Sequence, residues 1–264
     1  MRTDFDLIIR EFPNREDIVI IPVSDVHLGA LEHMTDEWEK FCKDILNQPN
    51  VYVTLGGDLI NNATRTSVSN VFKETMRPSA QKRKMAEMLK PLAKNGRILC
   101  AVSGNHERRS GKDADDDPMS DIMCKLDLED IYRENMAFVK IKMGKQNGDG
   151  LTNPTYCLAV THGAGGGIYT GGAVNRNERF GYVIDGIDGL IVGHTHKGAI
   201  TKPAKVCVDK FNNKVSMKQF VVVSSVPWMN YGDYALQKML LPATSGDHQK
   251  ILLHGKQKKI SLIW

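Results

Sequence analysis

Short apolar runs that end in a glycine-bearing loop with a metal-capable side chain recur along this sequence. The clearest is Val51–Leu55, whose five apolar or β-branched residues precede Gly56, Gly57 and Asp58. A continuous apolar run of this length is typical of a strand that is covered on both faces. Asp58 would then lie just beyond the carboxyl end of the strand, where open α/β sheets bind their ligands. The recurrence of this arrangement constrains both the fold and the site.

The first hundred residues alternate between strand and helix patterns. Strands are predicted at Ile18–Val23, Val51–Leu55 and Ile98–Val102, and amphipathic helices are predicted after residue 35 and over residues 79–94. Thr35 or Asp36 is expected to cap the first helix. The β-α-β-α-β order is typical of a parallel sheet with crossover helices. Residues 7–12 are predicted to pair with the strand at residues 18–23 around a turn at residues 13–15.

The second half of the sequence has shorter strand patterns. Residues 113–117 are interpreted as a solvated acidic loop, and a helix is predicted over residues 119–131. Strands are predicted at residues 137–143, 155–160 and 189–192, and antiparallel strands at residues 206–211, 215–224, 251–254 and 260–264. The glycines of residues 165–172 match no phosphate-binding loop, so this segment is either a flexible active-site loop or a plain linker.

Composition places the chain among ordinary globular proteins. Its 264 residues lack a linker or an internal repeat, so we expect a single domain over residues 1–264. The net charge of +4 is too small to indicate a nucleic-acid partner by itself. No apolar run approaches the roughly 18 residues of a membrane span, and the first residues are unlike a signal peptide. The five cysteines are scattered without CxxC spacing, which indicates reduced thiols and a cytoplasmic location.

Metal-capable side chains follow five of the predicted strands. The predicted metal ligands are Asp25, His27, Asp58, Asn105, His162, His194 and His196. Five of the eight histidines lie at these strand ends, counting His106, whereas His33, His248 and His254 are interpreted as surface residues. In an extended segment residues i and i+2 point to one side, so Asp25 and His27 are expected to bind one ion together.

The ligand set indicates the kind of ion. Two carboxylates, one amide and four imidazoles without a cysteine suit divalent ions such as Mn²⁺, with Fe²⁺ and Zn²⁺ as alternatives. Seven ligands exceed one tetrahedral site, so two ions that share a carboxylate are the economical arrangement. Such pairs lie about 3.5–4 Å apart and stabilise the attacking and leaving oxygens of a phosphoryl displacement.

These motifs, in this order, resemble the complete motif set of the calcineurin-like metallophosphoesterases. The motifs are Asp25-Val26-His27, Gly57-Asp58, Gly104-Asn105-His106-Glu107, His162 and Gly193-His194-Thr195-His196. The resemblance implies an α/β fold, a four-layer αββα sandwich of two mixed sheets flanked by helices, with a bimetal site at the carboxyl edge of the strands. It also implies that Asp25, His27 and His196 bind one ion, that Asn105, His162 and His194 bind the other, and that Asp58 bridges them.

The resemblance further assigns a catalytic role to His106, which matches the family's histidine that contacts the phosphate without binding metal. Its reference pKa of about 6.5 suits general acid catalysis, and the alternative is that it only hydrogen-bonds a ligand. Glu107 either orients a neighbouring group or faces solvent. Arg108 and Arg109 are candidates for substrate binding, because a guanidinium binds phosphate bidentately.

The sequence therefore predicts a two-metal hydrolase of phosphate esters, in particular a phosphodiesterase that acts through a metal-activated water. The alternatives are a DNA exonuclease or endonuclease of the repair type, a protein phosphatase, and a non-catalytic scaffold of the same fold. The partner is a phosphate ester, a nucleotide or a nucleic acid, and no membrane is expected. Small basic patches occur at residues 82–84, 176–179 and 256–259, and the aromatic segment at residues 228–234 either covers the site or belongs to the core.

Overall fold

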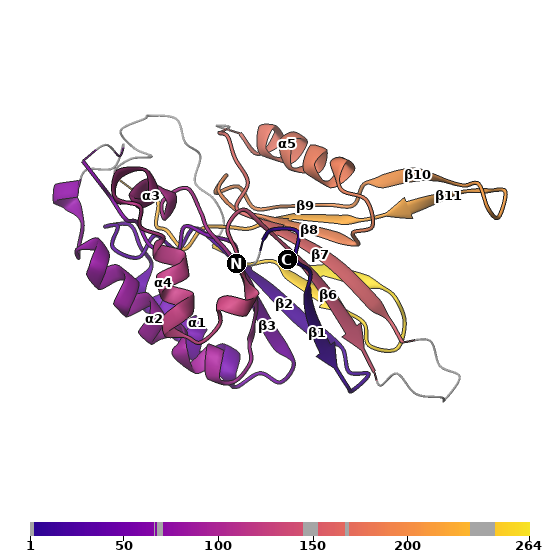
Figure 1. Cartoon of the computed structure of the whole chain (residues 1–264), viewed down its shortest axis with the longest axis horizontal. Helices are drawn as coiled ribbons and strands as arrows, with labels where there is room; N and C mark the ends of the chain where they lie inside the picture. The colour runs from indigo at the N-terminus through magenta and orange to yellow at the C-terminus, as the bar shows by residue number, and fades with distance from the viewer. Residues whose placement is uncertain (1–2, 66, 68–70, 145–152, 167–168, 233–245) are drawn as a thin grey trace.

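The computed structural model describes residues 3–65, 67, 71–144, 153–166, 169–232 and 246–264, and all structural statements below refer to these residues. Figure 1 shows two sheets lying against each other with helices on both outer sides. The helices are α1 (Thr35–Leu46), α2 (Pro78–Lys94), α3 (Arg108–Ala114), α4 (Pro118–Lys125) and α5 (Thr170–Val183), with short 3₁₀ turns at Val71–Lys73 and Glu129–Ile131.

The described strands form two mixed sheets and a separate hairpin. The first sheet has the order β1 (Ile8–Phe12), β6 (Met136–Met143), β7 (Thr155–Thr161), β8 (Gly189–Val192), β12 (Val221–Ser224), β9 (Ala199–Thr201). The second has the order β14 (Ile260–Ile263), β13 (Lys250–Leu253), β2 (Ile18–Val23), β3 (Val51–Leu55), β4 (Ile98–Val102), β5 (Tyr132–Arg133). The hairpin joins β10 (Ala204–Asp209) to β11 (Lys214–Gln219).

One apolar core joins the two sheets. Buried side chains of β2 and β3 belong to the same cluster as buried side chains of β6 and β7. Helix α2 contacts α1 and α4 on the outer side of the second sheet, and α5 contacts β8, β9 and β12 of the first. The predicted fold class, a four-layer αββα sandwich of two mixed sheets, is confirmed. That residues 1–264 form a single domain stays a prediction.

The central strands follow the predicted pattern. β2, β3 and β4 are mutually parallel and almost fully buried, because their apolar runs are covered by α1 and α2 on one side and by the first sheet on the other. Their carboxyl ends therefore lie at one edge. No described helix is long and apolar enough to cross a lipid bilayer.

Two predicted strand arrangements are wrong. Residues 7–12 and 18–23 do not form a hairpin, since β1 pairs in parallel with β6 in the first sheet and β2 pairs with β3 and β13 in the second. Residues 215–224 do not form one strand, because the exposed β11 ends at Gln219 and the buried β12 pairs in parallel with β8. The change from alternating to continuous apolar residues marks that boundary.

The helix predictions also need correction. The predicted helix at residues 119–131 ends at Lys125, because Asp127 adopts a left-handed conformation with φ of 56°. Asp117 caps α4 by accepting from the Ser120 amide, so the acidic segment is structured. Neither Thr35 nor Asp36 caps α1, which has Met34 at its N-cap position. The glycine-rich segment enters α5, whose first turn contains Gly171 and Gly172.

Candidate metal centre

The strand-end side chains of the two sheets converge at one place. Asp25 and His27 follow β2, Asp58 follows β3, Asn105 and His106 follow β4, His162 follows β7, and His194 and His196 follow β8. The loops are held together by main-chain bonds: the Asp25 amide donates to Gly57 O at 3.0 Å and the His27 amide donates to Asp58 O at 3.0 Å. We call these eight residues the strand-end cluster. All of them except Asn105, His106, His194 and His196 are buried.

The backbone at this cluster is not extended. Five of the cluster residues have left-handed φ angles, between 49° and 68°: Asp25, His27, Asp58, His194 and His196. Asp25 and His27 therefore do not lie in an extended segment, and that prediction is wrong, although the two residues do lie together. Non-glycine residues in this region cost of order 1–3 kcal/mol each and persist where surrounding bonds hold them, which is typical of functional sites.

The buried carboxylates are each fixed by one oxygen and offer the other to the cluster. Asp25 Oδ2 accepts from the Ser24 hydroxyl and from the His194 amide, the latter at 2.9 Å. Asp58 Oδ1 accepts from the His106 amide at 2.8 Å. The remaining oxygen of Asp58 faces three imidazoles, at 3.2 Å from His162 Nε2, 3.7 Å from His106 Nε2 and 3.9 Å from His27 Nε2. The hydrogen bonds thus orient both carboxylates.

The imidazole nitrogens lie close to one another across the cluster. His27 Nε2 is 3.2 Å from His196 Nε2, and His162 Nε2 is 3.2 Å from His194 Nδ1. His162 Nε2 is also 2.9 Å from Asn105 Oδ1. Three groups have ligand atoms within 4.8 Å of one another: Asp25, His27 and His196; Asp58, His162 and His194; and His27, Asp58 and His106. The first two match the ligand sets implied for separate ions, with Asp58 on the side of the second; ligation itself stays a prediction.

The chemistry of this donor set fits divalent cations. His162 Nδ1 donates to Gly56 O at 2.8 Å, so the ring, once it has lost the proton on Nε2, directs the lone pair of this nitrogen towards Asn105 Oδ1 and Asp58 Oδ2. The buried Asp25 Oδ1 accepts no hydrogen bond of normal geometry, although His196 Nε2 lies 3.1 Å away. Acceptors that converge in this way repel one another, and a cation between them removes the repulsion.

The pKa values of these groups agree with a cation site. Burial would lower the pKa of His162, but the adjacent Asp58 carboxylate raises it to about 10. Burial likewise opposes charge on Asp58 itself, yet the surrounding histidines hold the pKa of this carboxyl well below its usual value. Protons therefore occupy the position that a metal ion would take, and the two compete.

Glu107 joins two of the loops that carry the cluster. Its carboxylate is fully buried and accepts four main-chain N–H groups: Asp58 and Gly104 on Oε2, each at 2.9 Å, and Leu59 and Ile60 on Oε1, at 2.7 and 3.2 Å. Burial raises the pKa of Glu107 to about 7. The sequence left open whether this residue orients a neighbour or faces solvent; it ties the loop after β3 to the loop after β4.

His106 and the two arginines differ in their surroundings. His106 Nδ1 lies 2.8 Å from Asn61 O, and its Nε2 lies 2.8 Å from Arg109 Nη2. Because Arg109 donates, His106 Nε2 is an acceptor and the ring is neutral; burial lowers its pKa to about 4. Arg108 instead donates to the main-chain oxygens of Ser103 and Glu134. Of the two arginines predicted to bind substrate, Arg109 is the one bonded to a cluster side chain.

The other histidines are not simple surface residues. His33 is buried, with Nδ1 2.8 Å from Val26 O, which corrects the sequence interpretation. His248 stacks on Trp228 with ring centroids 3.8 Å apart, and His254 forms an ion pair with Asp17 at 3.0 Å. Trp228 is buried against α1, so it belongs to the core. Residues 233 and 234 of the aromatic segment lie outside the described residues.

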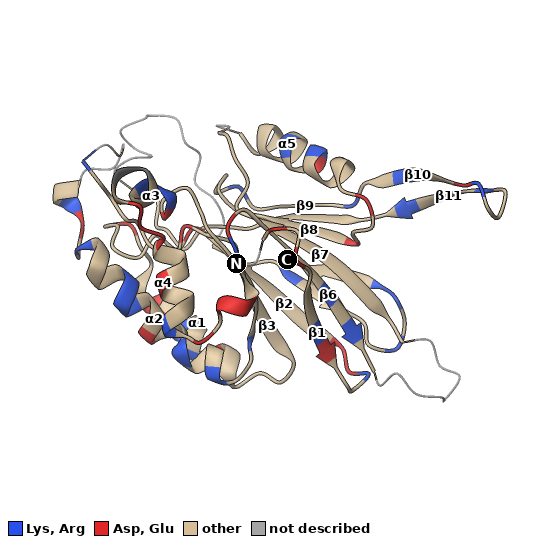
Figure 2. Ribbon diagram, viewed as in Figure 1, with Lys and Arg blue, Asp and Glu red and all other residues tan. Residues whose placement is uncertain are grey.

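The basic patches are neutralised in part by neighbours. Lys82 pairs with Asp116 at 3.0 Å and Asp121 at 2.6 Å, and Lys258 pairs with Asp188 at 2.9 Å. Arg176 donates to Ala164 O. Figure 2 shows lysines and arginines spread over several elements and interspersed with acidic residues. No described patch on its own therefore indicates a nucleic-acid groove.

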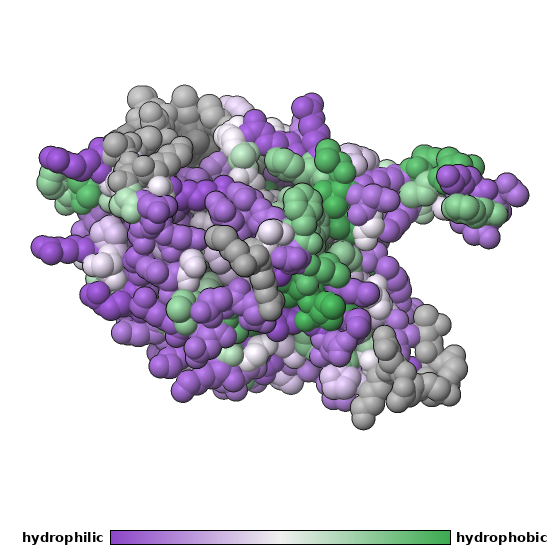
Figure 3. All heavy atoms as spheres, viewed as in Figure 1, coloured by the Kyte–Doolittle hydropathy of each residue, from purple (hydrophilic) through white to green (hydrophobic). Residues whose placement is uncertain are grey.

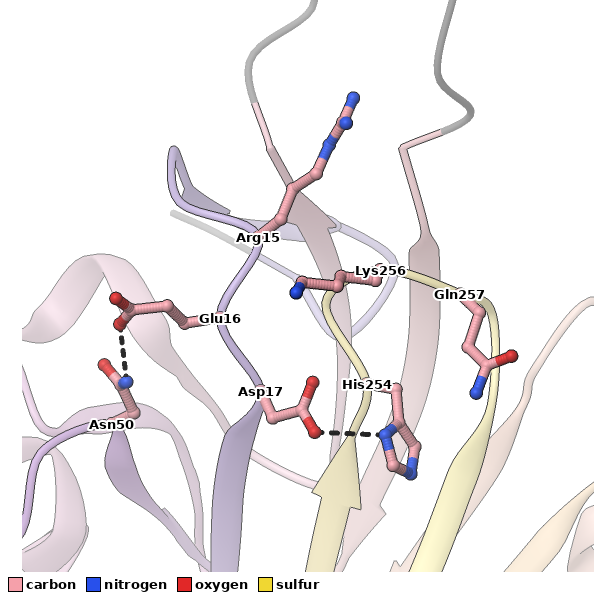
Figure 4. A pocket seen from close by; sticks show the side chains of 7 residues that line it. All are labelled: Arg15, Glu16, Asp17, Asn50, His254, Lys256 and Gln257. Carbon is pink, nitrogen blue, oxygen red and sulfur yellow. Dashed lines mark hydrogen bonds and ion pairs between the residues drawn. The ribbon is translucent and has the colours of Figure 1, made fainter.

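A cavity of about 590 Å³ lies away from the cluster, at the opposite edge of the second sheet (Figure 4). It is lined by Arg15, Glu16, Asp17, Asn50, His254, Lys256 and Gln257. Asp17 directly precedes β2, whereas Asp25 follows its far end, so the length of the strand separates the cavity from the cluster. The cavity does not belong to the candidate metal centre.

Comparisons with known proteins agree with the metal centre that the geometry indicates. A family model described as calcineurin-like phosphoesterase matches residues 18–198, more than half of the chain, and this range includes every residue of the cluster. A search among curated proteins gave no match.

Several solved structures resemble the chain weakly. A protein from Streptococcus pneumoniae TIGR4 described as a predicted phosphoesterase has 10% identity and a TM-score of 0.39, and a metallophosphoesterase from Sphaerobacter thermophilus has 16% and 0.40; each covers 94% of this chain and 89% of the other. The NAD nucleotidase of Haemophilus influenzae has 11% identity and a TM-score of 0.44, over 94% of this chain and 49% of that one. Similarities of this size carry no argument about substrate.

Proposed function

The chain belongs to the calcineurin-like phosphoesterase family, and from this premise we propose that it is a two-metal phosphodiesterase. Membership of the family makes it a metal-dependent hydrolase of phosphate esters. The number and identity of the ions, the roles of individual residues and the preference for diesters are the proposed part. The observation that carries the proposal is the convergence of two buried carboxylates, an amide and four imidazoles on one point with their acceptor atoms facing inward.

The proposed ligands divide into two sets. Asp25, His27 and His196 would hold one ion, Asn105, His162 and His194 the other, and Asp58 would contact both. The bound ions would activate the attacking water and neutralise charge on the phosphoryl oxygens. Mn²⁺ is the proposed metal, because nitrogen and oxygen donors without a thiolate suit it; Fe²⁺ and Zn²⁺ satisfy the same donors.

Arg109 and His106 are proposed to act on the phosphate and on its leaving group. Their polar atoms face each other at 2.8 Å, so a phosphoryl oxygen that accepts from Arg109 takes this guanidinium away from His106 Nε2. The freed Nε2, oriented by the bond from Nδ1 to Asn61 O, would then take up a proton from solvent and pass it to the leaving oxygen. Burial and the Arg109 charge together lower the pKa of His106, so proton uptake becomes easier once that charge is paired with the phosphate. One guanidinium suits the single negative charge of a phosphodiester.

A substrate panel on metal-reconstituted protein tests this proposal. The protein is stripped with a chelator, reloaded with Mn²⁺, Fe²⁺ or Zn²⁺, and assayed with bis(p-nitrophenyl) phosphate, p-nitrophenyl phosphate, a phosphopeptide and single-stranded DNA. We expect faster hydrolysis of the diester than of the monoester, and loss of both activities after chelation.

Other results would favour other functions. Preference for the monoester or the phosphopeptide contradicts the phosphodiesterase proposal but leaves a phosphoesterase. DNA cleavage that falls steeply with salt favours a nuclease. Absence of any hydrolysis by protein that has bound metal favours the non-catalytic scaffold.

A further inference from the structure

The hairpin β10–β11 projects from the body of the protein with apolar side chains in solvent. Figure 1 shows it extending beyond β9, and Figure 3 shows apolar atoms on its surface. Its exposed fractions are 71% for Val206, 73% for Val208, 66% for Val215, 75% for Met217 and 85% for Phe211 at the tip. Scattered apolar residues on a surface are ordinary, but these five lie on a single two-stranded element.

The register of the hairpin places four of these side chains on one face. Val206 is directly opposite Met217, and Val208 is directly opposite Val215. Because residues i and i+2 share a face and opposed residues point the same way, the four form one continuous block. Its neighbours on that face are Ala204 and Gln219, so the face carries no charge within the described strands. We call it the apolar hairpin face.

The other face of the hairpin carries the charges and lies nearer the body. It contains Lys205, Asp209, Lys214 and Lys218, with Cys207 and Ser216. Lys205 is half-buried: its Nζ donates to Ile184 O at 2.5 Å and lies 5.3 Å from the centre of the Phe220 ring. A sheet in a monomer turns its apolar face to the core and its charged face to water. This hairpin does the reverse.

We propose that the apolar hairpin face is a self-association surface, on which the hairpins of two copies stack face to face about a two-fold axis. An isolated two-stranded hairpin is marginally stable, and a second sheet layer supplies the core that it lacks. The face is made mainly of β-branched side chains, which pack well sheet on sheet. An uncharged block of this kind is complementary to itself, as a two-fold interface requires.

The charges permit this pairing. Stacked sheets lie about 10 Å apart, and the lysines of each hairpin point away from the shared interface. They are then separated by more than the screening length of about 8 Å at physiological ionic strength. A phosphate backbone that contacted the lysines would leave the apolar face in water, so a nucleic acid does not explain that face.

The size of the face predicts a weak dimer. With Phe211, two facing hairpins would bury on the order of 1,000 Å² in total, which is near the lower limit of specific interfaces. We therefore expect a reversible dimer whose population rises with protein concentration. The proposal is independent of the proposed function, since no cluster residue takes part.

Sedimentation velocity on the 264-residue chain tests this interface with a pair of adjacent substitutions. Val215→Lys places a charge on the apolar hairpin face, and Ser216→Lys places the same charge on the opposite face of the same strand. For the wild type and S216K we expect the average mass to rise from 29.5 kDa towards twice that value as concentration increases. For V215K we expect the dissociation constant of the dimer to rise by more than about tenfold, because a buried unpaired charge opposes association.

Several outcomes would overturn the proposal. A wild-type protein that stays monomeric at high concentration would overturn it without any variant. Equal association of V215K and S216K would also overturn it. Circular dichroism checks that V215K is folded, and if it is not, amide exchange of β10 and β11 in the wild type should slow as concentration rises. Loss of binding to phosphatidylserine vesicles in V215K, without a wild-type dimer, would instead assign the face to a lipid surface.

Discussion

At the scale of single residues, the direction of each cluster carboxylate depends on hydrogen bonds from the neighbouring loops. Asp58 directs one oxygen to the imidazoles only because its own amide is held by Glu107 and its other oxygen by the His106 amide. Asp25 is held in the same way by Ser24 and by the His194 amide. The supporting bonds therefore set the direction of each carboxylate, which a metal centre requires.

We expect Glu107→Gln to destabilise the protein. A carboxamide keeps the size of the side chain but replaces one acceptor oxygen with a donor, so two of the four buried N–H groups lose their partner. Each unpaired group costs roughly 1–3 kcal/mol, which predicts a loss of roughly 2–6 kcal/mol in the free energy of unfolding. Urea denaturation measures it, with the exposed Glu134→Gln as control. Equal stability of E107Q and the wild type would contradict this role.

We expect Arg109→Ala to weaken substrate binding. Removing a charge-assisted hydrogen bond to the phosphate predicts a KM increase on the order of 10- to 100-fold. Arg108→Ala is the matched control, because Arg108 donates to main-chain oxygens and its loss should lower stability with little change in KM. Steady-state kinetics with the diester measures both. A larger KM effect for R108A than for R109A would reverse the assignment.

The sequence predicted which residues come together in the cluster, but it did not predict the backbone conformation and hydrogen bonds that hold them there. Strand ends brought the cluster residues together because apolar runs and their order along the chain define a sheet edge. The left-handed backbone of Asp25 and His27 could not be predicted from residue type, since it depends on hydrogen bonds to a loop some thirty residues away. The four N–H partners of Glu107 were hidden for the same reason.

At the scale of elements, the loops after β3 and β4 lie in direct contact. Gly57 has a φ of 84°, and a Cβ added there would lie 2.4 Å from the Gly104 amide nitrogen. A Cβ added to Gly104 would lie 2.1 Å from Asp58 Oδ1. The two glycines therefore allow a contact between backbones that no other residue would permit.

We expect Gly57→Ala and Gly104→Ala to lower the free energy of unfolding by more than about 2 kcal/mol and to displace Asp58. Gly111→Ala in α3 is the control: its nearest neighbour would be Asp116 O at 3.6 Å, so the substitution should be neutral or stabilise by up to about 1 kcal/mol. Thermal unfolding with and without Mn²⁺ measures the effect. Wild-type stability of both G57A and G104A would contradict the close contact.

The local sequence patterns located most strands and helices but assigned some strands to the wrong pairing partners. The apolar runs at β2, β3, β4 and β8 were located correctly, because buried parallel strands have a distinct composition. β1 was paired with its neighbour in sequence, whereas it lies in the other sheet beside β6. A short strand and a turn look alike in both arrangements, and only the packing of the two sheets decides between them.

At the scale of the whole molecule, buried histidines couple folding to pH. His248 stacks on Trp228, and burial lowers its pKa from 6.5 to about 4. Between these values the unfolded chain binds a proton that the folded protein does not, so the free energy of unfolding falls as pH decreases from 6.5 to 4 and levels off below.

We expect His248→Gln to reduce this dependence, because the variant has no proton to bind at that position. Urea denaturation of the variant and of the wild type at several pH values between 7 and 4 measures it. An identical pH dependence of H248Q and the wild type would contradict the stated cause.

The two-sheet architecture was predictable only through the family resemblance. Alternating strands and helices predicted a parallel sheet, which the second sheet contains in β2, β3 and β4. Nothing in the local patterns placed β6 to β9 in a separate sheet whose strand ends face the first set. That placement brings His162 and His194 to Asp58, so the candidate site depends on it.

The most direct test of the central claim is the number of metal ions that each chain binds. Protein dialysed against Mn²⁺ and then freed of unbound ions is analysed by mass spectrometry of its metal content. We predict about two ions per chain in the wild type and fewer than one in Asp58→Asn. The side-chain oxygen of the introduced carboxamide would still accept from the main-chain N–H of His106, but the variant lacks the negative charge that both ions would share. A wild type that binds no metal, or an Asp58→Asn variant that binds as many ions as the wild type, would contradict the two-metal account.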